Sequence, residues 1–223
     1  MTPTDLREMI AATIRVLRDS NRTEDVHRVE EISGRARVAE LVAQAHAGDR
    51  ELAALLRERP EIDREHVDFD ALHRLGPETL GGAYVRHLER NGLELYTVET
   101  SDEFIDDDEA RYLIHRYRQT HDIWHVLFGV GVAGHEEVLI HAFAYGQVGL
   151  PVSAMIMLLG GLKHMVLERR WLALRRGLWE AYWSGRRAKP LLTIRWEELW
   201  DRPVAELRRS LGIRPATPAF VSG

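Results

Sequence analysis

Apolar residues recur at helical spacing along most of this chain. After Thr4-Asp5, the apolar residues follow an i, i+3 or i+4 pattern that predicts a first helix to about residue 18. The positions of this first series are Leu6, Met9, Ile10, Ile14 and Leu17. The same spacing predicts further helices over residues 38–45, over residues 52–56 before Pro60, and over residues 79–88, where Asn91-Gly92 is a suitable stop.

Alternation of apolar and polar positions, the pattern of a half-buried strand, is scarce. Two short segments show it, residues 93–98 and 191–194, and each is too isolated to build a sheet. No repeat, low-complexity linker or domain boundary interrupts the helical pattern. The sequence therefore predicts a mainly α, multi-helix fold in a single domain over residues 1–223.

The most apolar run covers residues 152–162 and closes at Lys163-His164 after eleven residues. A membrane-spanning helix needs about 20 apolar residues, so this run does not predict one. It predicts a buried core helix instead. Its methionines, Met155 and Met157, also suit the wall of a site for long alkyl chains.

Residues 107–130 predict a longer helix with chemically active side chains near its end. His121 and His125 stand one turn apart, and Asp122 stands three residues before His125. At helical spacing the three side chains fall within about 100° of arc. One face of this helix therefore offers two imidazoles and a carboxylate.

A second carboxylate follows in the next element. The glycine-rich stretch 129–134 ends the helix, and a new helix that begins near His135 returns Glu137 to the same face. Two carboxylates and two imidazoles in an apolar neighbourhood cost several kcal/mol unless a cation balances them. The candidate ligands of a divalent metal are therefore His121, Asp122, His125 and Glu137.

The same residues allow a plainer interpretation. A lone His-x-x-x-His pair is more often hydrogen-bonded at the surface or in the core than bound to metal, and the two carboxylates shift the balance toward a metal. Three nearby histidines are interpreted as ordinary polar or buried residues: His135, His141 and His164.

Composition narrows the chemistry. The chain has 223 residues, of which 45% are hydrophobic and 29% charged, as expected of a globular domain with a sizeable core. It contains no cysteine, which excludes disulfides, iron–sulfur clusters and thiolate zinc sites. The remaining nitrogen and oxygen ligands favour zinc, with iron as the alternative because the same set suits oxygen chemistry.

Charge bears on partners and location. A formal net charge of −5 argues against general nucleic-acid binding. Residues 1–8 lack the basic start and apolar core of a secretory signal and carry two acids, so a cytoplasmic location is expected.

The charges are also unevenly distributed. Seven acids lie within residues 99–109 and are interpreted as a helix N-terminus, where carboxylates accept from free N–H groups. Residues 163–189 carry eight Lys or Arg, interleaved with aromatic residues. A solvated helix face explains this segment, and peripheral contact with anionic lipid at the inner face of a membrane is the alternative.

Residues 116–129, which read RYRQTHDIWHVLFG, resemble the Coq-four family of ubiquinone-biosynthesis proteins. The family's hallmark is His-Asp-x-x-His, eleven intervening residues and Glu. It is matched without a gap by His121, Asp122, His125 and Glu137. Further segments are similar to the family, so that the resemblance spans about residues 22–213; they are residues 77–84, 142–147 and 195–213.

The resemblance implies a metal-dependent step in ubiquinone formation, in which C1 of a polyprenylated 4-hydroxybenzoate-derived ring loses its carboxyl group and gains a hydroxyl. It implies a metal motif on a central helix and an apolar channel between helices for the prenyl tail. The expected partners are this prenylated precursor and other ubiquinone-biosynthesis enzymes, and a homodimer is left open. Besides the ligands, which would be the catalytic residues, side chains that could contact the substrate are Tyr84, Arg118, Gln119, Tyr145 and Gln147.

Other function classes stay open. Four protein ligands saturate a tetrahedral zinc ion, which suits a non-catalytic prenyl-lipid-binding scaffold that organises other pathway enzymes. A metal-dependent hydrolase of the His-Asp type needs an upstream histidine, such as His87 or His115, and a downstream aspartate, of which none precedes Asp201 convincingly. A zincin-like peptidase fits poorly because Asp122 stands where the general-base glutamate belongs.

Overall fold

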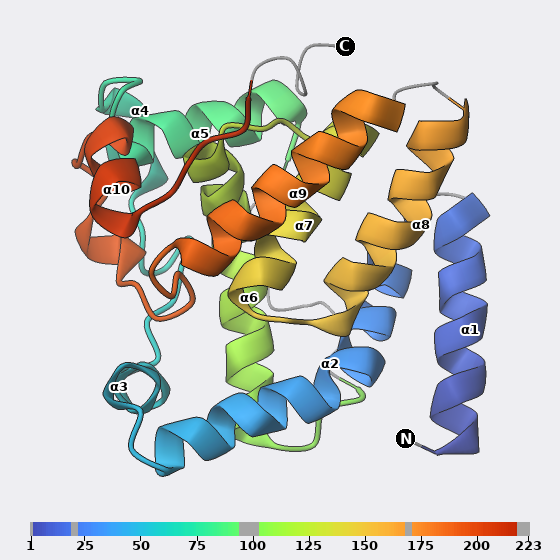
Figure 1. Cartoon of the computed structure of the whole chain (residues 1–223). Helices are drawn as coiled ribbons and strands as arrows, with labels where there is room; N and C mark the ends of the chain where they lie inside the picture. The colour runs from blue at the N-terminus through green and yellow to red at the C-terminus, as the bar shows by residue number, and fades with distance from the viewer. Residues whose placement is uncertain (1, 19–21, 94–102, 168–170, 218–223) are drawn as a thin grey trace. The chain divides into compact units, whose positions relative to one another are not determined.

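A computed structural model describes residues 2–18, 22–93, 103–167 and 171–217 (Figure 1). Contacts within it divide the chain into two compact units. The first unit consists of Met1–Arg59, Thr97–Tyr117 and Leu150–Val152, and the second of Pro60–Tyr96, Arg118–Gly149 and Ser153–Gly223. The single-domain organisation expected from the sequence stays a prediction.

The described residues are mainly helical. In chain order the helices are α1 (Pro3–Arg18), α2 (Thr23–His46), α3 (Arg50–Glu58), α4 (Phe69–Arg74), α5 (Leu80–Asn91), α6 (Asp108–Phe128), α7 (Gly134–Gln147), α8 (Pro151–Leu167), α9 (Trp171–Arg187), the 3-10 turn η1 (Trp196–Glu198) and α10 (Val204–Leu211). Within the described ranges no strand forms, and an isolated bridge joins Thr79 and Pro203. The predicted mainly α class is confirmed.

Helix boundaries agree best where the apolar pattern is clean. The helices expected over residues 107–130 and from His135 are α6 and α7. By contrast, α2 is much longer than the predicted residues 38–45. Its first half buries three acids that interrupt the apolar pattern: Asp25, Glu30 and Glu31.

The candidate strands add no sheet. Residues 191–194 form turns and irregular backbone before η1, and most of residues 93–98 lies outside the described residues. The Leu191 backbone N–H donates to the side-chain oxygen of Gln147 at 2.8 Å. A side chain of α7 therefore takes the place of a strand partner.

Ion pairs join α1 to α2 in the first unit. Arg15 of α1 donates to the buried Asp25 of α2 at 2.7 Å, and Arg22 donates to the same carboxylate. The hydrogen bonds from Arg15 and then Arg22 lower the pKa of Asp25 to about 2. The apolar series predicted for α1 is largely exposed, at Leu6, Ile10 and Ile14.

The acidic run begins α6, as predicted. The Asp107 carboxylate accepts from the Ala110 backbone N–H at 2.8 Å, which satisfies one free donor of the first turn. Asp108 accepts from the Arg59 guanidinium at 2.6 Å. The structure confirms the role at the helix start for Asp107, whereas Asp108 pairs with a side chain and residues 99–102 lie outside the described part of the chain.

In the second unit, α7 and α9 pack closely together (Figure 1). A Cβ atom added at Gly185 would lie 2.1 Å from the Phe143 carbonyl oxygen, and one at Gly146 would lie 2.5 Å from that of Tyr182. The Gln147 side chain donates to the Gly185 carbonyl across the same contact. Glycine at these two positions therefore sets the distance between the two helices.

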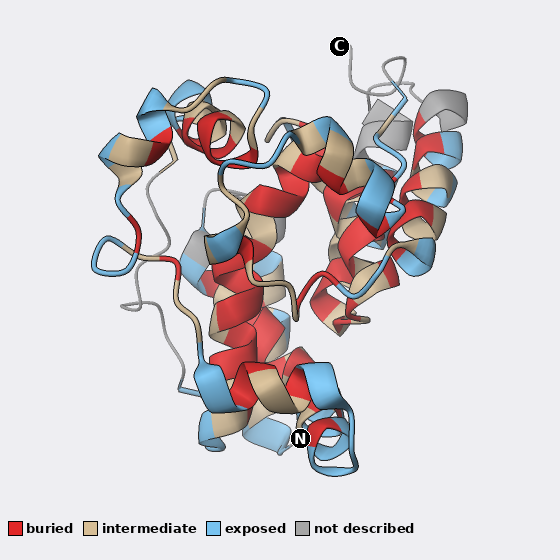
Figure 2. Ribbon diagram, turned by 90° about the vertical axis from the view of Figure 1, so that its left-hand side faces the viewer, coloured by how far each residue is buried: buried red, intermediate tan, exposed pale blue. Residues whose placement is uncertain are grey.

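The buried core helix predicted over residues 152–162 is only partly correct. Val152 is buried, whereas Leu158, Leu159 and Leu162 are 65%, 38% and 54% exposed, and Figure 2 shows how buried and exposed residues are distributed. The run forms most of α8, and these three leucines are its exposed large apolar residues among those described. As far as the chain is described, none of its helices combines the length and apolarity needed to cross a membrane.

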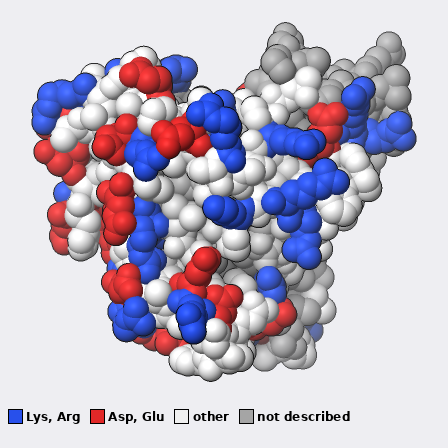
Figure 3. Space-filling model, turned by 60° about the vertical axis from the view of Figure 1, so that its left-hand side comes forward, with Lys and Arg blue, Asp and Glu red and all other residues white. Residues whose placement is uncertain are grey.

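Residues 171–187 of the basic segment form α9, and their described side chains behave as a solvated face. Arg176 donates to Glu180 at 2.9 Å, one turn away, and Trp179 is 65% exposed. On the face drawn in Figure 3, acidic and basic side chains are interspersed.

A pocket of about 580 Å³ lies beside α9. Its walls come from α9, from the segment after α10, and from Phe128 and Leu139. Neither the predicted metal ligands nor residues 152–162 line it. The apolar channel for a prenyl tail therefore stays a prediction.

Candidate metal centre

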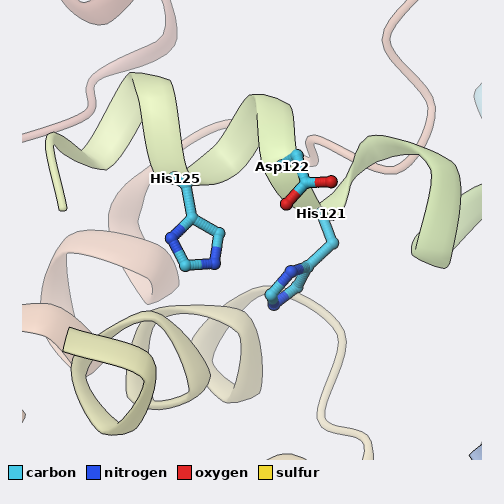
Figure 4. A group of neighbouring side chains, drawn as sticks. All are labelled: His121, Asp122 and His125. Atoms are coloured by element: carbon cyan, nitrogen blue, oxygen red, sulfur yellow. The ribbon is translucent and has the colours of Figure 1, made fainter. Parts of the chain in front are cut away.

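Three of the four predicted ligands converge on one side of α6. The ligand atoms of His121, Asp122 and His125 all lie within 4.8 Å of one another (Figure 4). Both imidazoles leave the same side of the helix, as the helical spacing requires. Among the described residues, these three side chains form the one cluster of three or more His, Asp or Glu residues that is close enough to hold a metal ion.

The loop after α6 fixes the orientation of His125. Its Nδ1 lies 3.0 Å from the Gly131 carbonyl oxygen, so Nδ1 carries the proton and Nε2 keeps a lone pair for an ion. The Glu136 carboxylate holds the same loop by accepting from the backbone N–H groups of Gly131 and Ala133. Hydrogen bonds thus tie the ligand, the loop and the start of α7 together.

Glu137, the fourth predicted ligand, reaches the cluster from the first turn of α7. Its Oε1 lies 3.6 Å from His125 Nε2, at the edge of the group formed by the other three. Burial raises the pKa of Glu137 to about 8, and the nearby Asp122 carboxylate adds to the shift. The sequence therefore predicted four residues that the structure brings together.

Burial shifts the other ligands toward their neutral forms as well. It raises the pKa of Asp122 to about 6 and lowers that of His121 to about 4. It also lowers the pKa of His125 well below its usual value. Neutral imidazoles can bind a metal without first losing a proton, and a bound cation would favour the ionised carboxylates.

Two further histidines surround the cluster. The ring of His87, on α5, lies 5.3 Å from that of His125, and the ring of His141, on α7, lies 5.3 Å from that of His121. From the sequence, His87 was a candidate only for the upstream histidine of a hydrolase, and His141 was interpreted as an ordinary polar or buried histidine. Neither lies within the His-Asp-x-x-His motif, so only the packing of α5 and α7 shows that both border the site.

The end of α6 is held from a distant part of the chain. Arg208 of α10 donates to the carbonyl oxygens of Leu127 at 2.8 Å and Val126 at 3.0 Å. These carbonyls belong to the last turn of α6, where a positive charge also opposes the negative end of the helix dipole. Arg208 thereby stabilises the turn that follows His125.

The two distant segments that carried the family resemblance contact each other. Backbone N–H groups of Leu80 and Gly81 donate to the carbonyls of Arg202 and Trp200, each at 2.8 Å. A Cβ at Gly81 would lie 3.2 Å from the Trp200 side chain, which in turn stacks on Tyr84. These segments hold α5 in place beside the histidine cluster.

Two of the side chains proposed to contact the substrate already make hydrogen bonds within the protein. Gln147 bonds to the backbone of Gly185 and Leu191. Gln119 donates to Glu61 and accepts from the Ile62 backbone. Because both amides already hold neighbouring segments together, the prediction that they bind substrate is not supported. The remaining candidates, Tyr84, Arg118 and Tyr145, stay predictions.

Comparison with known families identifies the chain. The model of the family described as "Coenzyme Q (ubiquinone) biosynthesis protein Coq4" matches residues 5–217. The chain belongs to this family. The resemblance predicted over about residues 22–213 is thus confirmed, and the family match extends it at the N-terminal end.

Curated relatives from fungi and mammals agree. Mitochondrial ubiquinone biosynthesis protein COQ4 of Yarrowia lipolytica is 35% identical over 71% of this chain and 60% of its own length. The COQ4 homolog of Mus musculus, also described as mitochondrial, is 35% identical over 78% of this chain and 65% of its own length. The chain thus spans about half to two thirds of these family members.

A solved structure shares the fold. The crystal structure of a Nostoc punctiforme protein, for which a role in ubiquinone biosynthesis has been suggested, is 26% identical. It matches with a TM-score of 0.73 over 92% of this chain and 97% of its own. The helical arrangement described above is therefore that of the family.

Proposed function

We propose that this chain is a metal-dependent enzyme of ubiquinone biosynthesis that replaces the C1 carboxyl group of a polyprenylated 4-hydroxybenzoate-derived ring with a hydroxyl. Family membership supports the pathway. The observation that carries the enzymatic part is the cluster of His121, Asp122 and His125, with Glu137 at its edge.

The donor set fits a divalent ion. His125 presents Nε2 because Nδ1 donates to Gly131, and the two carboxylates lack a balancing guanidinium or ammonium group among the described residues. Two imidazoles with carboxylates match the ligands of zinc, which we propose as the resident ion. Iron is the alternative, and it would add redox chemistry that zinc lacks.

When bound, the ion would supply Lewis-acid or oxygen chemistry at the ring. The four predicted ligands would hold it, with the carboxyl groups of Asp122 and Glu137 in their ionised forms. The reaction releases the carboxyl group as carbon dioxide, and the added hydroxyl requires an oxidant, for which molecular oxygen is the expected class.

A second candidate function is a prenyl-lipid-binding scaffold at the periphery of a membrane. The exposed leucines of α8, at positions 158, 159 and 162, favour it because they form an apolar surface suited to lipid. Under this alternative the metal stabilises the fold, and other pathway enzymes are partners.

The cytoplasmic location and a homodimer stay predictions, while the relatives are described as mitochondrial.

Metal content tests the site. Elemental mass spectrometry of the purified wild type and of the exposed control His73→Ala should show near-stoichiometric zinc or iron, whereas His125→Ala should show none. The control removes a histidine from the same unit that is 58% exposed. If none of the three proteins binds either metal, the ligand assignment is wrong.

Glu137→Ala separates enzyme from scaffold. An enzyme should lose turnover of a prenylated 4-hydroxybenzoate while the variant remains folded. A structural metal site should instead lose thermal stability together with its metal. Full turnover in Glu137→Ala would contradict the catalytic assignment.

A further inference from the structure

His87 of α5 reaches the ligand cluster from a separate helix. Its side chain is 10% exposed, and its Nε2 is buried and has no hydrogen-bond partner among the described residues. This atom lies 3.9 Å from Asp122 Oδ1. An unsatisfied buried polar atom costs about 1–3 kcal/mol, so it commonly marks a contact completed in another state of the site.

Asn91 decides which nitrogen of His87 carries the proton. Asn91 Nδ2 donates to the His87 carbonyl oxygen at 2.8 Å, which orients the amide with its NH₂ group toward His87. The same Nδ2 lies 3.4 Å from His87 Nδ1. Because an NH₂ group offers only donors, Nδ1 is the acceptor and the neutral imidazole carries its proton on Nε2. An N–H group therefore faces Asp122.

We propose that His87 is a positioning residue that holds the Asp122 carboxylate, with Nε2–H donating to Oδ1 while the other oxygen faces the ion. The inference rests on the proposed metal site. A shortening of about 1 Å brings the pair to hydrogen-bond distance. His87 is not itself a metal ligand, because the nitrogen that faces the site is protonated and Asn91 occupies the other.

Zn²⁺ affinity and the Co²⁺ absorption spectrum test this role. His87→Phe keeps a ring but removes the donor, and it should weaken Zn²⁺ binding by roughly 10- to 100-fold in a chelator competition, as loss of an outer partner of a ligand does. The spectrum of bound Co²⁺ should change. His87→Gln restores an N–H donor and should recover most of the affinity, and the exposed control His73→Phe should bind like the wild type.

A double-mutant cycle shows whether His87 acts through Asp122. In an Asp122→Asn background, His87→Phe should cause little further loss of Zn²⁺ affinity, whereas a direct ligand would cause the same loss in both backgrounds. If His87→Phe does not fold, Asn91→Leu keeps His87 but removes the group that fixes its tautomer, and it should weaken Zn²⁺ binding several-fold.

The outcomes separate this inference from the proposed function. Unchanged Zn²⁺ affinity in folded His87→Phe or Asn91→Leu overturns the role of His87 and leaves the metal site intact. Additive losses in the cycle overturn it too, in favour of a direct ligand. A wild type that binds neither Zn²⁺ nor Co²⁺ overturns both proposals.

Discussion

Two aspartates, one in each unit, have opposite pKa shifts. Asp25 joins α1 to α2, and the guanidinium groups of Arg15 and Arg22 lower its pKa to about 2. Asp122 lies among histidines, and burial raises its pKa to about 6. Among the described residues, the sole group of opposite potential charge within 4 Å of Asp122 is His87, at 3.9 Å.

The difference distinguishes a structural carboxylate from one available for binding. The charge of Asp25 is balanced within the fold, so its ionised form stabilises the first unit. Among the described side chains no arginine or lysine balances the charge of Asp122, and its ionised form costs free energy until a cation arrives. Both aspartates stand in helices, and in the structure the two differ in the side chains that lie beside them.

The strongest test replaces Asp122 with Asn. Loss of this ligand should weaken Zn²⁺ binding by about 10³-fold, more than loss of an outer partner would. Without metal, the variant should nevertheless be more stable than the wild type at pH 7, with a free energy of unfolding that is higher by about 1–2 kcal/mol. Chelator competition and urea unfolding measure the two effects.

The stability gain of Asp122→Asn has a defined pH window. Its native pKa of about 6 lies above the ordinary value of 3.8, so the cost of the ionised form is fully present above pH 6 and disappears as pH falls toward 4. The variant and the wild type should therefore have similar metal-free stability near pH 4. Equal stability at pH 7 would show that the Asp122 charge is already balanced.

The motif and its helices were predictable from sequence because they depend on local spacing. His121, Asp122 and His125 share one face of any helix, and the glycine-rich stretch 129–134 makes a return to Glu137 the natural continuation. The expected helix over residues 107–130 and the helix start near His135 correspond to α6 and to the beginning of α7.

Contacts between distant segments were not predictable. Asn91 and His87 acquire a role only because α5 packs beside α6, and Gln147 was proposed to bind substrate although it bonds to α9. The run over residues 152–162 was expected to be buried because apolar composition does not show whether another element covers a helix. A single sequence records which side chains are apolar, not what lies against them.

A second test concerns the packing that supports the site. Gly185→Ala should destabilise the protein by about 3 kcal/mol, because the new Cβ would lie 2.1 Å from the Phe143 carbonyl oxygen, which belongs to the backbone of α7. Thermal unfolding measures the loss. Gly48→Ala is the control: nothing lies within 4 Å of its Cβ position, so it should cost only backbone strain at φ +113°, about 1 kcal/mol. Similar losses in both variants would argue against close packing of α7 and α9.

Asp25→Asn is the counterpart of Asp122→Asn in the first unit. It should lower stability by about 1–2 kcal/mol at pH 7 because Arg15 and Arg22 lose their ionised partner, and it should leave Zn²⁺ affinity unchanged. The native pKa of about 2 lies below the ordinary value of 3.8, so the contribution of Asp25 is complete above pH 4 and is lost as pH falls toward 2. Urea unfolding of both proteins between pH 7 and pH 2 should show the two curves converging at the acid end. A constant difference would assign the loss to packing instead of charge.

The smallest expected effect belongs to Arg208→Met, which keeps much of the aliphatic chain but removes the donors to the carbonyls of Val126 and Leu127. Loss of this cap should cost about 1 kcal/mol, because the carbonyls at the end of α6 lose their partners and the helix end loses a positive charge. His125 belongs to the same final turns, so Zn²⁺ affinity should also fall, by about threefold (~0.7 kcal/mol), while the change in Asp25→Asn stays confined to stability. Arg209→Met, at the next position of α10 and exposed, is the matched control and should change neither property. A stability loss without any change in Zn²⁺ affinity would mean that the ligand geometry is set by the Gly131 and Glu136 contacts alone, and that the end of α6 is as independent of the metal site as Asp25 is.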